Sequence, residues 1–282
     1  MSVEHIAILG AGTMGHGIAH VSALAGYRVS LYDIDDGRVS AGLKKVRGNL
    51  EKGVEKGKLT AEARDEALAL ISGTSALADL APADLVIEAV PERIELKQAL
   101  FRDLDALCGP ATIFATNTSS LSIARIAAAL RDPSRMIGTH FFNPVHIMTL
   151  LEVVVHPGTR EDVRAAVLEY GTRIGKECIV VNDAPGFATS RLGVCLGMEA
   201  IRMVEQGVAS PEDIDKAMSL GYRHPVGPLR LTDMVGLDVR MSIGEYLARE
   251  LNNPAFEPPQ LMRRMVAEGK LGQKSGQGFY RW

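Results

Sequence analysis

The sequence contains few cysteines and no long apolar run. Its 282 residues include only Cys108, Cys178 and Cys195. Their wide spacing offers no CxxC metal or redox pair, and the odd number argues against a disulfide framework, so a reducing compartment is expected. No apolar run reaches the ~18 residues that a membrane helix needs. The N-terminus also lacks the basic start and cleavage site of a secretory signal, and these absences predict a soluble cytoplasmic protein with no metal site.

Neither sign of charge predominates. The chain has 31 Lys and Arg against 34 Asp and Glu, a formal net charge of −3 and a pI of about 6.2. This balance gives no general attraction to nucleic acid or to an acidic membrane, so neither is expected as a partner. The hydrophobic content of 46% and the charged content of 23% are ordinary globular values, which exclude a mainly disordered or collagen-like chain.

Residues 5–140 alternate between short apolar runs and longer segments with helical periodicity. This alternation is typical of βαβ units and predicts an α/β fold with a doubly wound, Rossmann-type and mainly parallel sheet. Two further apolar runs flank a helix-like segment at 161–176 and could extend that sheet. The expected strands are 6–9, 28–32, 85–89, 112–115, 136–141, 150–155 and 178–181.

After Pro185-Gly186 the strand pattern stops, and the chain has helical periodicity to its end. The length suits about two domains at ~150 residues each. We therefore expect a first domain at 1–184 and an all-helical second domain at 185–282. The expected helical segments of the second domain are 188–206, one opened by Ser210-Pro211 and closed by Gly221, 229–251 and 259–268, followed by a glycine-rich tail.

A glycine-rich turn follows the first expected strand. In GxGxxG the first glycine permits a tight turn, the second lets the backbone approach a pyrophosphate, and the third allows close helix packing. Asp33 ends the second expected strand about 20 residues downstream, where a carboxylate can accept hydrogen bonds from an adenosine ribose. This spacing favours an NAD site over a purely structural turn, and Asp33 disfavours NADP, although nearby Arg38 leaves NADP open. The turn consists of Gly10, Ala11, Gly12, Thr13, Met14 and Gly15.

Three further segments carry a more specific pattern: Asn-Thr-Ser-Ser-Leu-Ser-Ile at 117–123, His-Phe-Phe-Asn-Pro at 140–144, and Gly-Gln-Lys-Ser-Gly-Gln-Gly-Phe-Tyr at 272–280. With the glycine-rich turn they resemble the 3-hydroxyacyl-CoA dehydrogenase family, especially its short bacterial 3-hydroxybutyryl-CoA branch. The resemblance implies NAD-dependent oxidation of an L-3-hydroxyacyl-CoA to the 3-ketoacyl-CoA, as in fatty-acid β-oxidation. It also implies a homodimer formed through the C-terminal helical domain.

The resemblance assigns the catalytic histidine to His140 and its partner acid to Glu152. An imidazole with an ordinary pKa near ~6.5 can take a hydroxyl proton, and a carboxylate can orient the ring and stabilise the imidazolium. Glu152 lies within the apolar run 150–155, and strand alternation puts Leu150 and Val154 on its face. This favours a buried, paired acid over an acid on an edge strand, so His140 and Glu152 could face each other across neighbouring strands.

The resemblance also places Ser119 at the substrate oxygen, and Asn117 and Asn143 beside the nicotinamide. The alternative for residues 117–120 is that they only cap a helix that begins near Leu121. Both functions could hold at once.

Several charged residues match further family positions. Glu92 and Lys97 correspond to residues that hold the nicotinamide ribose, although a glutamate there could simply be a favourable charge in the first turn of a helix. Lys274 corresponds to a lysine that reaches toward the cofactor, or it is a solvated charge. Lys52 and Lys56 are candidates for the phosphates of coenzyme A, or they belong to a solvated basic helix face.

The chain departs from the family pattern at two positions. Ser190 stands where the family has an active-site asparagine, so the side chain keeps a donor and an acceptor on a shorter arm. We expect Ser190 to act at the active site and to tune the acyl-chain preference, including toward a polar or carboxylated chain. His146 stands where the family has a proline, and it borders the acyl pocket or is an ordinary loop residue.

Two other functions remain open at this point. The first is a dehydrogenase of a free hydroxy acid or a sugar acid such as L-gulonate, which dependence on coenzyme A would distinguish. The second is a non-catalytic NAD-binding protein, such as the crystallins built on this scaffold. Ser119, His140 and Glu152 argue against the second, because function depends on the site and not on the fold.

Overall fold

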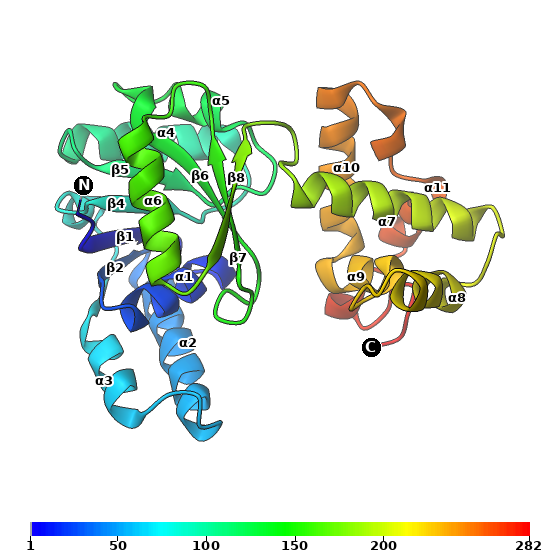
Figure 1. Cartoon of the computed structure of the whole chain (residues 1–282), viewed down its shortest axis with the longest axis horizontal. Helices are drawn as coiled ribbons and strands as arrows, with labels where there is room; N and C mark the ends of the chain where they lie inside the picture. Colours follow the sequence, from blue (N-terminus) through cyan, green and yellow to red (C-terminus); the bar gives the residue numbers. More distant parts are fainter. Residues whose placement is uncertain (1) are drawn as a thin grey trace. The chain divides into compact units, whose positions relative to one another are not determined.

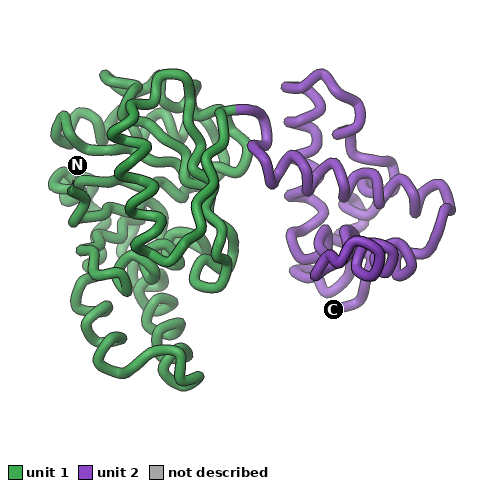
Figure 2. Tube along the Cα trace, in the orientation of Figure 1, with its two compact units in different colours: residues 1–183 green, residues 184–282 purple. Residues whose placement is uncertain are grey.

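The computed structural model describes residues 2–282, which divide between residues 183 and 184 into two compact units (Figure 2). The first unit contains the sheet, and the second is helical (Figure 1). Within the described residues, no helix is both long enough and apolar enough to cross a membrane.

The first unit is built on one eight-stranded sheet with the order β3-β2-β1-β4-β5-β6-β7-β8. Strands β6 and β7 pair antiparallel, and the other neighbouring pairs are parallel. The expected mainly parallel, Rossmann-type sheet is therefore confirmed. The strands are β1 (His5–Leu9), β2 (Arg28–Tyr32), β3 (Ile71–Thr74), β4 (Leu85–Glu88), β5 (Ile113–Thr116), β6 (Met136–Phe141), β7 (Leu150–Val155) and β8 (Glu177–Asn182).

Strand β3 was not among the expected strands. Its sequence, Ile-Ser-Gly-Thr, contains a single large apolar residue, and it lies at the edge of the sheet where little apolar surface is needed. The strand forms because it pairs with β2, its one neighbour in the sheet. Four residues are too few to show the apolar alternation by which a strand is predicted from sequence.

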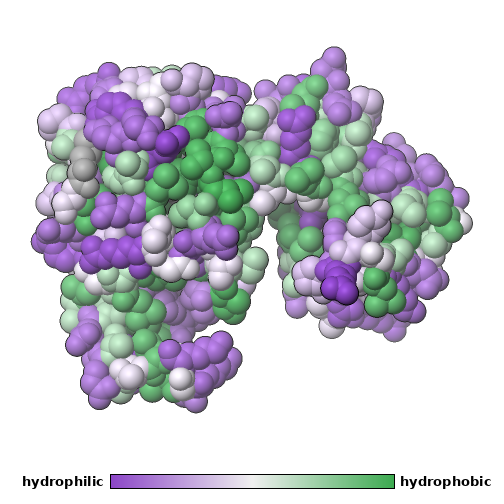
Figure 3. Space-filling view, in the orientation of Figure 1, coloured by the Kyte–Doolittle hydropathy of each residue, from purple (hydrophilic) through white to green (hydrophobic). Residues whose placement is uncertain are grey.

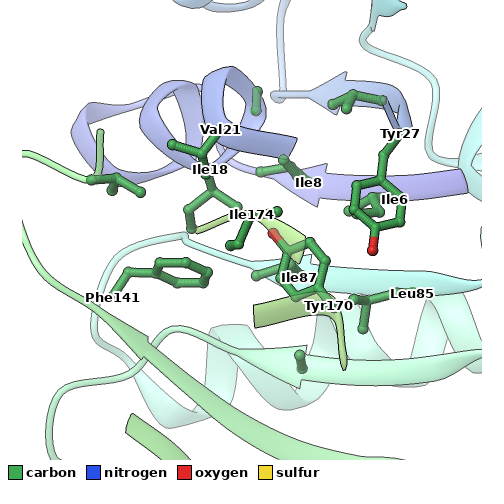
Figure 4. Close-up of a cluster of buried hydrophobic side chains, with 14 of the residues drawn as sticks. Ile6, Ile8, Ile18, Val21, Tyr27, Leu85, Ile87, Phe141, Tyr170 and Ile174 are labelled. Carbon is green, nitrogen blue, oxygen red and sulfur yellow. The ribbon is translucent and has the colours of Figure 1, made fainter. Parts of the chain in front are cut away.

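Helices cover both faces of this sheet. Ile18 of α1 and Tyr170 of α6 pack with Ile8 and Ile87 in the core (Figure 4), and the Ser22 hydroxyl lies 2.8 Å from the Tyr170 hydroxyl. On the other face α4 packs against β5: strand alternation turns the Phe114 side chain away from that core, and its ring meets the Phe101 ring of α4 edge-on, with centroids 5.8 Å apart. The helices of the first unit are α1 (Thr13–Leu24), α2 (Asp36–Glu55), α3 (Ala61–Ala69), α4 (Ile94–Leu107), α5 (Ile123–Ala127) and α6 (Glu161–Arg173).

The second unit is helical, as expected, and has its own apolar core around Met198, Ile201 and Leu247. Its helices are α7 (Thr189–Glu205), α8 (Pro211–Lys216), α9 (Pro228–Val235), α10 (Leu237–Leu251) and α11 (Gln260–Ala267), and a π-helical turn, Ala217–Gly221, follows α8. Ser210 caps α8 by accepting a hydrogen bond from the backbone N–H of Asp213 at 3.2 Å.

The expectation of one continuous helix over 229–251 is wrong. Gly236 has a φ of +104° and separates α9 from α10. This backbone conformation excludes helical continuation, and a Cβ at Gly236 would lie 3.2 Å from Nζ of Lys274. The apolar periodicity continues across the break, so the sequence pattern alone does not reveal it.

Candidate active site

The glycine-rich turn between β1 and α1 has the backbone geometry of a dinucleotide cradle. Gly10 has a φ of +96°, a conformation that residues with a Cβ rarely adopt. A side chain on Gly15 would overlap the carbonyl oxygen of Gly10, whereas a Cβ on Gly12 would meet no atom within 4 Å. The first and third glycines therefore serve the turn and its packing, and the second leaves open space beside the backbone.

The beginning of α1 offers a position for an anion. Gly12 is the N-cap and provides no capping side chain, so the first N–H groups of the helix lack a side-chain acceptor from that residue. The aligned peptide dipoles add partial positive charge at this end, which favours a phosphate group. Ala11, Thr13 and Met14 supply the rest of the backbone here, and the turn fits the pyrophosphate of NAD.

Asp33, at the end of β2, lies beside this turn. Its Oδ2 accepts a hydrogen bond from the Ala11 N–H at 2.9 Å, and its Oδ1 accepts one from the Ile34 N–H at 2.8 Å. Each carboxylate oxygen can accept a further hydrogen bond, so the half-buried Asp33 can bind ribose hydroxyls while it stays anchored. Arg38 forms an ion pair with Asp35 at 3.1 Å. The geometry therefore fits a ribose without a 2′-phosphate, as in NAD.

His140 and Glu152 form a buried pair across β6 and β7. The antiparallel register sets the two residues opposite each other, with Nδ1 of His140 2.6 Å from Oε2 of Glu152. They are 6% and 0% exposed, respectively. A carboxylate in an apolar strand needs a partner that compensates for its lost hydration, and the imidazole supplies one. The expected contact and the expected burial of Glu152 are both confirmed.

Asn117 connects the loop after β5 to β6, the strand that contains His140. Its Oδ1 accepts a hydrogen bond from the backbone N–H of Phe141 at 2.9 Å, one residue beyond His140. The half-buried Ser119 follows two residues later in the same loop. This contact joins the loop of Ser119 to the strand of His140.

The alternative that residues 117–120 cap the next helix is wrong. Helix α5 begins at Ile123, and its N-cap is Ser122, which accepts a hydrogen bond from a first-turn backbone N–H at 3.3 Å. The carboxylate of Asp183 accepts two more backbone hydrogen bonds, from Ile123 at 3.0 Å and from Ala124 at 2.8 Å. These residues satisfy the start of α5, whereas the Thr118 hydroxyl accepts hydrogen bonds within the preceding loop, from the Ser120 N–H at 3.3 Å and the Leu121 N–H at 2.9 Å.

Glu92 also binds the loop of Ser119. Its Oε1 accepts hydrogen bonds from the Thr118 hydroxyl and from the Ser119 N–H, the latter at 3.0 Å. Its Oε2 lies 3.2 Å from Nζ of Lys97, which is 1% exposed. The two predicted residues Glu92 and Lys97 are therefore in direct contact.

Lys97 has a second carboxylate partner, Glu88, at the end of β4. Nζ of Lys97 lies 2.6 Å from Oε1 of Glu88, and Glu88 is fully buried. Burial raises the pKa of Glu88, and the Lys97 ammonium opposes that rise. Glu88 is absent from the residues expected in the site, although an acid in an apolar strand is the same signal that identifies Glu152.

A groove of about 460 Å³ in the first unit is formed by α1, α2, the end of α6 and the loop between β6 and β7. The imidazoles of His20 and His146 stack there with ring centroids 5.2 Å apart. Burial lowers the pKa of His146, and nearby cations lower it further, among them Lys58 and Lys56. The predicted Lys56 is therefore near the loop that follows β6, and Lys52 is exposed one turn earlier on α2.

The remaining predicted residues, Asn143, Ser190 and Lys274, take part in none of the contacts given above. Asn143 is exposed in the loop after β6. Ser190 is half-buried in the first turn of α7, and Lys274 forms an ion pair with Asp238 at 2.6 Å, both within the second unit. Their roles toward cofactor and substrate stay predictions. Over residues 2–282, no group of three or more His, Cys, Asp or Glu side chains could hold a metal ion.

Comparison with protein-family models gives two matches that together span the chain. Residues 5–184 match the 3-hydroxyacyl-CoA dehydrogenase NAD binding domain, and residues 186–282 match the 3-hydroxyacyl-CoA dehydrogenase C-terminal domain. Two similar proteins are a probable 3-hydroxybutyryl-CoA dehydrogenase of Bacillus subtilis and a 3-hydroxybutyryl-CoA dehydrogenase of Mycobacterium tuberculosis. Each is 43% identical, and each alignment covers 99% of this chain and 98% of the relative. A 3-hydroxyadipyl-CoA dehydrogenase of Escherichia coli is 40% identical over 100% of this chain and 60% of its own length.

Solved structures show the same architecture. The structure of Mycobacterium tuberculosis FadB2 superposes with a TM-score of 0.97 at 42% identity and covers 100% of both chains. The structure of (S)-3-hydroxybutyryl-CoA dehydrogenase PaaH1 from Ralstonia eutropha superposes with a TM-score of 0.96 at 42% identity, covering 100% of this chain and 99% of the other.

Proposed function

The chain belongs to the 3-hydroxyacyl-CoA dehydrogenase family, and from that premise we propose that it oxidises a short-chain L-3-hydroxyacyl-CoA, such as 3-hydroxybutyryl-CoA, to the 3-ketoacyl-CoA. The observation that carries this proposal is the buried pair of His140 and Glu152, 2.6 Å apart, in the unit that also holds the dinucleotide turn. NAD-dependent oxidation of a secondary alcohol needs both a proton acceptor and a dinucleotide site.

NAD, when bound, supplies the hydride acceptor for this oxidation. The turn at 10–15 holds the pyrophosphate through its backbone N–H groups, and Asp33 accepts hydrogen bonds from the adenosine ribose. The residues proposed for the nicotinamide half are Glu92, Lys97, Asn117, Ser119, Asn143 and Lys274.

His140 takes the hydroxyl proton of the substrate. As the C–H hydrogen leaves the carbinol carbon with its electron pair, a C=O bond forms and the O–H proton must depart. Nδ1 of His140 faces Glu152, so the proton is exchanged at Nε2. Glu152 holds the ring in this tautomer and stabilises the imidazolium that forms. In the reverse reaction the imidazolium returns the proton to the ketone oxygen.

Two serines complete the proposed substrate contacts. Ser119 donates a hydrogen bond to the substrate oxygen, supported by its place in the loop that Asn117 ties to the end of the histidine strand. Ser190 takes the position of the family asparagine and tunes the acyl-chain preference, because a shorter side chain leaves more room beside the substrate.

Lys52 and Lys56 bind the phosphates of coenzyme A. Two observations support this role: both lysines lie at the end of α2, and Lys56 is near the groove that contains the His20 and His146 rings. Much of the groove lining is apolar, with cationic residues around it, which suits a chain that ends in a charged nucleotide.

The chain functions as a cytoplasmic homodimer in fatty-acid β-oxidation. In support of a dimer through the helical domain, the second unit exposes large apolar side chains, among them Leu192, Leu220 and Tyr222. Figure 3 shows hydrophobic residues at several places on the surface of this unit. The three cysteine thiols are free, which suits a reducing compartment.

The deciding experiment follows NADH formation with purified protein and NAD. The substrates are L-3-hydroxybutyryl-CoA, its D-enantiomer, 3-hydroxyadipyl-CoA, free L-3-hydroxybutyrate and L-gulonate. Turnover of the L-thioester without turnover of the free acids is the expected result. A preference for the adipyl thioester would show that the substrate is a dicarboxylic acyl-CoA and not a short-chain one. Turnover of a free acid alone would overturn the proposed function.

A further inference from the structure

A series of four connected groups runs from the interior of the sheet to the loop of Ser119. Glu88 contacts Lys97 at 2.6 Å, and Lys97 contacts Glu92 at 3.2 Å. Glu92 in turn accepts a hydrogen bond from the Ser119 N–H at 3.0 Å and another from the Thr118 hydroxyl. The series starts at a fully buried strand residue and ends at a residue proposed to touch the substrate.

The hydrogen bonds of Glu88 indicate a fixed carboxylate. Its Oε1 accepts from the Lys97 ammonium and from the Val90 N–H at 2.7 Å, and its Oε2 accepts from the Thr116 hydroxyl at 2.7 Å. Three donors converge on this side chain, which suits an ionised acid that only accepts. Since Glu88 is 0% exposed, its effect on the site must pass through these partners.

The Lys97 ammonium is also fully engaged. Its three N–H donors have three oxygen partners: Glu88 Oε1, Glu92 Oε2 and the Val90 carbonyl at 3.4 Å. A buried ammonium held by one carboxylate is already ordered, so its contact with a second carboxylate costs little further entropy. Lys97 therefore acts on the site through Glu92.

Glu92 depends on this anchor. Its side chain is 40% exposed and begins outside any helix, because α4 starts only at Ile94. An exposed glutamate has several accessible rotamers, and pairs between two exposed side chains contribute only ~0–1 kcal/mol. An anchored ammonium at 3.2 Å selects one rotamer, in which Oε1 receives the Thr118 and Ser119 donors.

We propose that Glu88 is a positioning residue for catalysis, acting through Lys97 and Glu92 to hold the Thr118–Ser119 segment where the substrate oxygen is bound. This inference rests on the proposed function, because it assumes that Ser119 contacts the substrate. It goes beyond the family resemblance, which assigns Glu92 and Lys97 to the cofactor and assigns nothing to Glu88.

The test compares Glu88→Gln with Thr116→Val. Glu88→Gln keeps the size of the side chain and removes the charge that orders Lys97. Thr116→Val removes the hydrogen bond to Oε2 of Glu88 and leaves the contacts of Oε1 with Lys97 and Val90, so it controls for loss of stability in the same pocket. We expect Glu88→Gln to lower kcat ~10-fold or more, since a displacement of ~1 Å can cost ~100-fold, with KM for the thioester changed less than ~3-fold. Thr116→Val should keep kcat within about 2-fold of wild type while lowering the unfolding temperature.

A double-mutant cycle with Glu92→Gln separates positioning from a general structural effect. If Glu88 acts through Glu92, Glu88→Gln should change kcat less than ~2-fold in the Glu92→Gln background. An equal effect in both backgrounds would overturn the proposal. If Glu88→Gln does not fold, Glu88→Gln combined with Lys97→Met removes the uncompensated charge, and wild-type kcat in that variant would also overturn it.

Hydrogen exchange over residues 117–121 keeps this inference distinct from the proposed function. Faster exchange of the Ser119 amide in Glu88→Gln, but not in Thr116→Val, is expected because the acceptor of that amide is no longer held. Unchanged exchange would contradict the positioning role even if no thioester were turned over. Absence of wild-type turnover would instead refute the proposed function.

Discussion

Glu152 lies in the middle of β7 with 0% exposure, and the imidazole of His140 is its charge partner. Replacing it with glutamine keeps the shape and one acceptor but removes the charge. The imidazolium formed during oxidation then loses the negative charge that stabilises it. The substitution should therefore lower turnover strongly and affect cofactor binding little.

We expect Glu152→Gln to lower kcat with L-3-hydroxybutyryl-CoA ~100-fold, and His140→Ala to lower it by ~10² to 10⁴-fold. NAD affinity, measured by calorimetry, should stay within about 2-fold of wild type because the dinucleotide turn is a separate part of the unit. Retention of full turnover in His140→Ala would remove this residue from the mechanism.

His20 predicts a pH dependence of stability. Burial lowers its pKa from 6.5 to about 4, and the neighbouring His146 contributes to the shift. The unfolded chain therefore binds a proton near pH 6.5 that the folded chain binds only near pH 4. The contribution of neutral His20 to the free energy of unfolding is fully present above pH 6.5. It is lost as the pH drops from 6.5 toward 4, by about 3 kcal/mol in total.

The variant His20→Gln should lose less stability than wild type over that pH range, as measured by urea unfolding at several pH values. His5 remains in the variant, and burial lowers its pKa as well, so some pH dependence should persist. Identical pH profiles for the two proteins would show that His20 is not buried in its neutral form.

At the scale of elements, the β1–α1 turn distinguishes binding from folding within one motif. Gly12 faces open space, whereas Gly15 is packed against the carbonyl oxygen of Gly10. The same added methyl group should therefore affect mainly binding at Gly12 and mainly folding at Gly15.

We expect Gly12→Ala to keep the unfolding temperature of wild type and to weaken NAD binding ~10-fold or more, because the methyl group occupies the approach of the pyrophosphate. Gly15→Ala should destabilise the fold by ~1–3 kcal/mol through overpacking, in addition to impairing binding. Thermal unfolding and calorimetry on both variants provide the comparison. Equal destabilisation by the two substitutions would contradict the separate roles.

At the scale of the whole molecule, the apolar surface of the second unit predicts self-association. Light scattering after size exclusion should give the mass of a dimer. Leu192→Asp combined with Leu220→Asp should shift the protein toward monomer, because both side chains are largely exposed in the single chain. Ile34→Asp, an exposed apolar position in the first unit, is the matched control and should leave the dimer intact. A monomeric wild type would exclude the dimer.

Much of the fold and part of the site follow from local sequence patterns. The apolar runs predict seven of the eight strands, and the GxGxxG spacing with Asp33 predicts the cradle whose geometry the structure displays. The burial and pairing of Glu152 can also be predicted from the sequence, because an isolated acid in an apolar strand requires a partner. Glu88 carries the same signal, but its partner Lys97 lies on α4, and neither spacing nor periodicity links the two.

The sequence by itself determined the Rossmann-type sheet, the helical second unit and the glycine-rich NAD turn, because each depends on residue type and short-range spacing, and its family resemblance implied the pairing of His140 with Glu152. Only the tertiary structure decided the break at Gly236, the contacts of Asp183 with the start of α5, and the connection from Glu88 through Lys97 and Glu92 to Ser119. These features join residues from separate elements. Such contacts depend on strand order, register and helix packing, which a local pattern does not encode.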